Sequence, residues 1–138
     1  MTGTRIERVR TRRDLEVVLS WLGRGGLGGE GLSPFRPERL LADPKVLLAL
    51  AWGREPKGFS RLDLGPGVAE FTLYVVPAHR RKGVGRLLLQ WALGEAKGRK
   101  LYSMVEEGNE RAHAFFRAQG FRSFLSGARG WIRWEVLP

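Results

Sequence analysis

Residues 75–86, which read VVPAHRRKGVGR, join a run of β-type residues to a run with helical spacing. The apolar residues 71–76 end at a proline, and leucines 87–89 follow the two glycines. Proline cannot donate a hydrogen bond to a strand ladder, and it commonly stands where a strand ends. The stretch therefore predicts a strand, a basic turn and a helix.

The predicted turn has the properties of an anion-binding site. The first four N–H groups of a helix lack partners within the helix and carry the positive end of its dipole. Gly83 and Gly85 would allow positive φ and remove Cβ atoms that keep a bulky anion from the backbone. Further positive charge comes from Arg80, Arg81, Lys82 and Arg86. These features predict a pyrophosphate site, and a plain turn with solvated charges is the alternative.

A second motif follows a predicted strand at residues 100–105. Asn109 is placed to cap a helix whose inner face carries Ala112, Phe115 and Phe116. Gly120 is placed to end this helix in the left-handed conformation.

The two motifs together resemble the GNAT (GCN5-related N-acetyltransferase) superfamily. The acetyl-CoA signature of that family is Gln or Arg, two residues, Gly, one residue, and Gly or Ala. The chain resembles this signature, because Arg80, Gly83 and Gly85 fill its three defined positions in order. Residues 73–77 resemble the Leu-x-Val-x-Pro pattern that precedes it. The second motif resembles the family's Asn followed by a short helix ending in Gly-Phe. The likeness covers about residues 46–134.

The resemblance implies an N-acetyltransferase that moves an acetyl group from acetyl-CoA, its cosubstrate, to a primary amine. It also implies that the turn holds the pyrophosphate, while the main chain of the preceding strand binds the pantetheine arm and polarises the thioester carbonyl. Asn109 either binds the coenzyme or only caps its helix. The coenzyme-binding residues implied in this way are Leu73, Val75, Val76, Arg80, Arg81, Lys82, Gly83, Val84, Gly85, Arg86, Asn109 and Phe116.

Glu70 is the candidate catalytic base. It interrupts an apolar strand and is expected on the face opposite Phe71 and Leu73, in a place that resembles the catalytic glutamate of the histone acetyltransferase branch. A carboxylate of ordinary pKa is a weak base toward an ammonium group, so desolvation or a relaying water is needed. The alternative is a strand carboxylate that only binds a cationic acceptor or an arginine, and Glu106 and Glu107 are second choices for the base.

Phe116 departs from the family, because many members have a tyrosine there that protonates the departing thiolate. Phenylalanine has no proton to donate. A thiol of ordinary pKa leaves tolerably as thiolate, and water, Tyr102 or Tyr74 could supply the proton instead. The alternative functions are a coenzyme A-binding module with weak or no turnover and a basic nucleic-acid-binding domain.

Composition limits the remaining functions. The formal charge of +10 favours acidic partners, but no basic stripe interleaved with aromatic residues indicates nucleic-acid readout. The absence of cysteine excludes disulfides and thiolate catalysis, and His79 and His113, expected on the surface, lack metal-ligand spacing, so we expect no metal. Without a long apolar run, we expect a soluble cytoplasmic protein and no membrane partner.

The 138 residues predict one domain, residues 1–138, with an α+β (mixed α/β) fold. We expect a central mixed, mostly antiparallel sheet flanked by helices on both faces, as in the GNAT fold. The glycine-rich residues 23–33 are either a substrate lid or a plain connection. The acceptor amine is left open among polyamines, antibiotics, amino acids, protein N-termini and lysine, and the resemblance is compatible with a homodimer. The expected strands are residues 5–10, 46–53, 59–64, 68–76, 100–105, 121–125 and 131–136, with helices at about 11–22, 37–41, 85–97 and 110–119.

Overall fold

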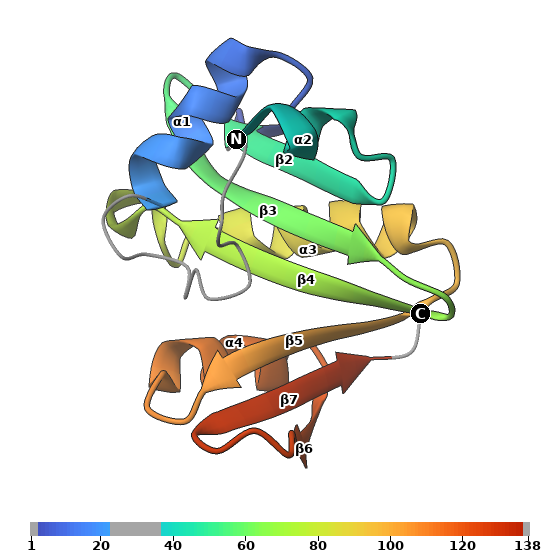
Figure 1. Ribbon diagram of the computed structural model, residues 1–138. Coiled ribbons are helices and arrows are strands. Elements are labelled where there is room, and N and C mark those ends of the chain that lie inside the picture. Colours follow the sequence, from blue (N-terminus) through green and yellow to red (C-terminus); the bar gives the residue numbers. More distant parts are fainter. Residues whose placement is uncertain (1–2, 23–36, 137–138) are drawn as a thin grey trace.

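The computed structural model describes residues 3–22 and 37–136, and these residues form a mixed sheet with helices on both faces (Figure 1). The strand order is β1-β2-β3-β4-β5-β7-β6, and among these described strands only β4 and β5 are parallel neighbours. This confirms the predicted fold. The strands are β1 (Arg5–Arg8), β2 (Val46–Trp52), β3 (Pro56–Leu64), β4 (Val68–Val75), β5 (Lys100–Glu106), β6 (Arg122–Leu125) and β7 (Trp131–Val136).

The helices divide between the two faces of the sheet (Figure 1). Helices α1 (Arg12–Leu22) and α2 (Pro37–Ala42) pack over Leu48, Leu50 and Phe59, on what we term the α1 face. Helices α3 (Val84–Ala96) and α4 (Glu110–Ala118) pack over Phe71 and Leu101, on the α3 face. None of the described helices is both long and apolar enough to cross a membrane.

Helix α1 begins as the sequence predicts. The Thr11 hydroxyl accepts a hydrogen bond from the Asp14 N–H at 3.1 Å, which satisfies one of the free donors of the first turn. Leu15 and Val18 lie one turn apart and are both buried against the sheet. The glycine-rich stretch predicted as a lid or a connection lies outside the described residues.

Strands β4 and β5 part after a short ladder. Their register has three pairs, the last of which joins Glu70 to Tyr102, yet both strands continue beyond it. Directly after that pair, the Ser103 hydroxyl donates to the Phe71 carbonyl at 2.7 Å. Figure 1 shows the two strands diverging toward their carboxyl ends. Main-chain groups of β4 that face this gap are therefore not paired with β5.

His113 is buried, so the prediction that it lies on the surface is wrong. Its Nδ1 accepts a hydrogen bond from Trp134 Nε1 at 3.0 Å, and its Nε2 lies 3.0 Å from the carbonyl oxygen of Glu107. An indole N–H can only donate, so the Nε2 atom of His113 carries the proton and donates to Glu107. The side chain thereby ties α4 to β7 and to the turn after β5. His79, also expected on the surface, is partly buried beside Glu55.

Replacing His113 with alanine is expected to lower the free energy of unfolding by roughly 1–3 kcal/mol, because the buried Trp134 N–H loses its acceptor. Urea unfolding followed by tryptophan fluorescence measures this loss. The matched variant, His79→Ala, removes a histidine whose partner Glu55 is exposed, so a smaller loss is expected. Equal losses in the two variants would contradict a structural role for His113.

Candidate active site

The basic turn brings the chain from β4 to an open helix N-terminus. After the 3₁₀ turn Pro77–His79, Arg81 has φ +62° and Gly83 has φ +84°, and α3 begins at Val84. Gly83 is the N-cap residue, and no side chain of the described chain caps this end of α3. The exposed side chains of Lys82 and Arg86 flank it. This end of α3 can therefore hold an anion by its N–H groups and dipole.

The two glycines of the turn have different roles. Gly83 has the predicted positive φ, and a Cβ atom there would meet open space. Gly85 lies within α3 and has no positive φ, so that part of the prediction is wrong. A Cβ atom on Gly85 would lie 3.1 Å from Phe115 Cε1 and 3.5 Å from Leu73 Cδ2. Gly85 thus allows α3 to pack closely against α4 and β4.

Arg80 points back to the end of β4. Its Nε donates to the Val75 carbonyl at 2.9 Å, and its guanidinium lies 5.9 Å from the centre of the Tyr74 ring. Arg80 is partly buried, whereas the other basic residues of the turn, Arg81, Lys82 and Arg86, are exposed. Arg80 fixes the corner between the strand and the turn.

Two of the three strand residues predicted to bind the coenzyme, Leu73 and Val75, lie on the part of β4 that has left the β5 ladder. The side chains of Leu73 and Val75 pack toward α3, beside Val84. Val76 follows the strand, and both of its main-chain groups are engaged, because its N–H donates to the Lys57 carbonyl at 2.9 Å and its carbonyl accepts from the His79 N–H at 2.8 Å. The prediction that its main chain binds the coenzyme is therefore wrong for this residue. Beyond Glu70, no described strand forms a ladder with the β5 side of β4.

Phe116 and Asn109 both belong to the α4 region. Asn109 caps the helix as predicted, because its Oδ1 accepts from the Ala112 N–H at 3.1 Å. Phe116 is buried in an aromatic cluster on the α3 face, with ring centres 6.4 Å from Phe71 and 4.9 Å from Phe121.

The two tyrosines considered as substitutes for a tyrosine at position 116 lie across the sheet. Tyr74 packs against Trp21 of α1, and Tyr102 alternates with the buried Leu101 and Ser103. Both therefore face the α1 side, whereas Phe116 lies on the α3 side. Neither tyrosine can occupy the place of Phe116.

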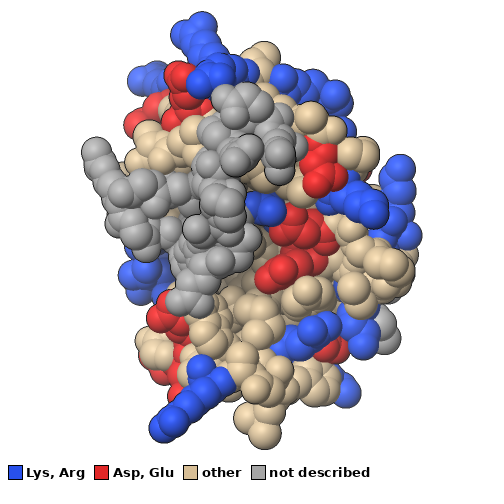
Figure 2. All heavy atoms as spheres, viewed as in Figure 1, with Lys and Arg blue, Asp and Glu red and all other residues tan. Residues whose placement is uncertain are grey.

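Glu70 lies in a row of side chains that crosses four strands on the α1 face. The register pairs Asp63 with Glu70, Glu70 with Tyr102, and Tyr102 with Glu135. We term these four residues the cross-strand row. Figure 2 shows acidic side chains gathered near the middle of this face of the molecule. The predicted second choices, Glu106 and Glu107, are exposed beyond the row, where β5 ends.

Ion pairs occupy the outer carboxylates of the cross-strand row. Asp63 accepts from Arg61 Nε at 3.0 Å, and Glu135 pairs with Arg133 and with Lys100 Nζ, the latter at 3.3 Å. Although desolvation opposes them, hydrogen bonds from Arg133 and Lys100 lower the pKa of Glu135. Glu135 is therefore held in its charged form.

Glu70 differs from its neighbours in the cross-strand row. Within the described residues it has no ion-pair partner, and its neighbour on β5 is the uncharged side chain of Tyr102. Burial raises the pKa of Glu70 and the nearby Asp63 raises it further, against the opposing effects of Arg61, Arg133 and the Tyr102 hydrogen bond. Glu70 is the carboxylate of the row best suited to accept a proton.

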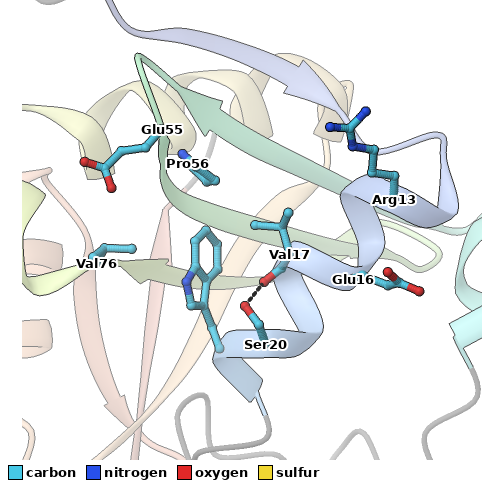
Figure 3. Close-up of a pocket in the computed structure, with 8 residues that line it drawn as sticks. Arg13, Glu16, Val17, Ser20, Glu55, Pro56 and Val76 are labelled. Carbon is cyan, nitrogen blue, oxygen red and sulfur yellow. Dashed lines mark hydrogen bonds between the residues drawn. The ribbon is translucent and has the colours of Figure 1, made fainter.

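A groove of ≈ 470 Å³ borders the same face between α1 and the end of β4. Figure 3 shows Glu55, Pro56 and Val76 on one side of it and Val17 and Ser20 of α1 on the other. The Ser20 hydroxyl donates to the Val17 carbonyl of its own helix at 2.6 Å, so it is satisfied without a ligand. The groove leaves space for a second molecule beside the strand.

Substituting alanine for Gly83 is expected to lower the free energy of unfolding by about 1–2 kcal/mol, because alanine is strained at φ +84°. Gly94 is the matched control, since it lies inside α3 and a Cβ atom added there would meet open space. Gly94→Ala should raise stability by about 0.5–1 kcal/mol. Urea unfolding checks both values, and a neutral Gly83→Ala would mean that the turn does not require its left-handed residue.

Comparison with known families agrees with this geometry. The model of the acetyltransferase (GNAT) family matches residues 17–121. A mycothiol acetyltransferase of Clavibacter sepedonicus is 36% identical over 96 residues, covering 66% of this chain and 32% of that protein. A mycothiol acetyltransferase of Clavibacter michiganensis subsp. michiganensis is 31% identical over 123 residues, covering 86% of this chain and 40% of that protein. The chain thus spans less than half the length of these curated relatives.

Solved structures show the same fold. An acetyltransferase from Thermus thermophilus superposes with a TM-score of 0.76 at 23% identity, over 100% of both chains. The PaiA N-acetyltransferase of Thermoplasma acidophilum, solved in complex with coenzyme A, has a TM-score of 0.75 at 21% identity and covers 97% of this chain and 99% of its own. With its two motifs, its parted strands and its family match, the chain belongs to the acetyltransferase (GNAT) family.

Proposed function

We propose that this chain transfers an acetyl group from acetyl-CoA to a primary amine by direct attack in a ternary complex. One observation carries the proposal: the gap between β4 and β5 opens beside the uncapped N-terminus of α3, with Glu70 at its base. The gap and the helix end together suit a long ligand that has an anionic part and an extended arm.

The donor would be held mainly by main-chain groups. The N–H groups of residues 82–86 suit the pyrophosphate, with Arg81, Lys82 and Arg86 adding charge. The pantetheine arm would lie along the side of β4 that has left the β5 ladder, where main-chain groups of Leu73 and the N–H of Val75 can bind it. Main-chain dipoles aimed at the thioester carbonyl would stabilise the oxyanion that forms on attack.

Glu70 would take the proton that the amine loses, directly or through one water molecule. The attacking amine must be neutral, and a desolvated carboxylate is a better base than an exposed one. The sequence has no cysteine to carry an acyl group, which favours direct transfer. Phe116 has no acidic proton, so the side chain at position 116 would not protonate the thiolate as it leaves.

The acceptor is proposed only as a primary amine. The two curated relatives are mycothiol acetyltransferases, but this chain covers 32% and 40% of their lengths. The groove beside α1 and the cross-strand row are on the same face, which would place the acceptor there. Action in the cytoplasm and assembly as a homodimer belong to this proposal as expectations from the sequence.

Replacing Glu70 with glutamine is expected to lower kcat for acetyl transfer by about 10²–10³ while leaving the KM for acetyl-CoA nearly unchanged. Release of free thiol from acetyl-CoA, measured over a panel of primary amines, checks this. Exposed Glu106→Gln is the matched control and should keep wild-type turnover. Turnover by Glu70→Gln at the wild-type rate would contradict the role of Glu70.

The same Glu70→Gln variant should not be less stable at neutral pH. Because its pKa is raised in the folded state, Glu70 binds its proton more tightly there than in the unfolded chain. It therefore lowers stability as the pH rises above the ordinary value of 4.5, and the variant should exceed the wild type in Tm at about pH 7 but not at about pH 3.

Binding of acetyl-CoA without thiol release from any amine would instead indicate a coenzyme-binding module, the function that Phe116 favours.

A further inference from the structure

Tyr102 occupies the last pair of the β4–β5 ladder, at the point where the gap begins. Its register partner on β4 is Glu70, and both side chains lie on the α1 face, where the Tyr102 hydroxyl helps to lower the pKa of the Glu70 carboxylate. Its register partner on β7 is Glu135, which two cations hold in place. The side chain is thus set between the candidate base and the ion pairs of the neighbouring strand.

Arg133 fixes the ring of Tyr102. The centre of the guanidinium lies 3.8 Å from the centre of the ring, within the range of a strong cation–π contact. The Nε atom of Arg133 also donates to Glu135, which in turn binds Lys100. Arg133 is therefore held both by the ring and by the carboxylate, and its position over the ring is a consequence of the β5–β7 register.

The Tyr102 hydroxyl lies on the side of the sheet that carries Glu70. Because Tyr102 is paired with Glu70 and faces the α1 side, its hydroxyl does not point to the place of Phe116 on the α3 face. Burial, and then the charge of Glu70, raise the pKa of Tyr102, so the hydroxyl keeps its proton at neutral pH. A role as proton donor to the thiolate is therefore disfavoured, and a role toward Glu70 is favoured.

We propose that Tyr102 is a positioning residue, which holds one oxygen of the Glu70 carboxylate while Arg133 holds the Tyr102 ring. The other carboxylate oxygen remains available for the proton of the amine. The inference rests on the proposed function and extends it from one residue to a set on three strands. The charged and titratable groups around Glu70 are Arg61 and Asp63 of β3, Tyr102 of β5, and Arg133 and Glu135 of β7.

A double-mutant cycle between Tyr102 and Glu70 tests the proposal. Tyr102→Phe alone is expected to lower kcat about tenfold, with the KM for acetyl-CoA unchanged. The acidic limb of its pH–rate profile should move to higher pH, because the lost hydrogen bond had lowered the pKa of Glu70. In the Glu70→Gln background, the same change should have no further effect. A full tenfold loss in that background would overturn the proposal.

Arg133→Gln should shift the acidic limb in the same direction as Tyr102→Phe, because the Tyr102 ring loses its support and Glu70 loses a nearby positive charge that lowers its pKa. In the Tyr102→Phe background only the effect of the charge remains, so the shift should be smaller there. The matched control is Arg10→Gln, which removes an exposed positive charge just after β1 and should leave the profile unchanged. If Tyr102→Phe changed the rate but Arg133→Gln matched Arg10→Gln in every respect, the supporting role of Arg133 would be overturned.

A titration without any substrate separates this inference from the proposed function. Carbon-13 NMR of the glutamate carboxylates, with Glu70 assigned from the Glu70→Gln variant, reports its titration in the free protein. The midpoint for Glu70 should be higher in Tyr102→Phe than in the wild type. An unchanged midpoint would overturn the positioning role, whereas a wild-type protein that acetylates no amine would overturn the proposed function and leave this measurement intact.

Discussion

The parting of β4 and β5 after Glu70 and Tyr102 is the constraint on which the rest of the site depends. Up to that pair the two strands hold each other in a parallel ladder, and beyond it the Phe71 carbonyl is bound by the Ser103 hydroxyl. The last pair therefore sets Glu70 at the edge of an opening. Without the parting, the main chain of β4 would be paired on both sides and could bind no ligand.

Contacts between elements on the α3 face hold the two sides of the opening apart. Gly85 allows α3 to lie against the Phe115 ring of α4, so the two helices meet behind the gap. His113 then joins α4 to β7 through Trp134. The aromatic cluster around Phe116 fills the space under β4 and β5. The α1 face, which carries the cross-strand row, is thus supported by an apolar layer on the other side of the sheet.

Local patterns in the sequence were sufficient for the elements and for much of the site. The Asn109 cap, the left-handed Gly83 and the face of Glu70 each depend on a few adjacent residues, and the structure has all three as predicted. The burial of His113 and the stacking of Arg133 on Tyr102 depend instead on which strands are neighbours and in what register. Single-sequence patterns carry no such information, so these partners could not be predicted.

The acyl donor is proposed to bind in the opening between β4 and β5, beside the N-terminus of α3. Nitrogen-15 NMR of the full chain during titration with coenzyme A tests this most directly, because it reports each backbone amide separately. The largest shifts should fall on the amides of residues 71–76 and 82–86. Shifts confined to the groove beside α1, or the same changes with ATP as with coenzyme A, would contradict it.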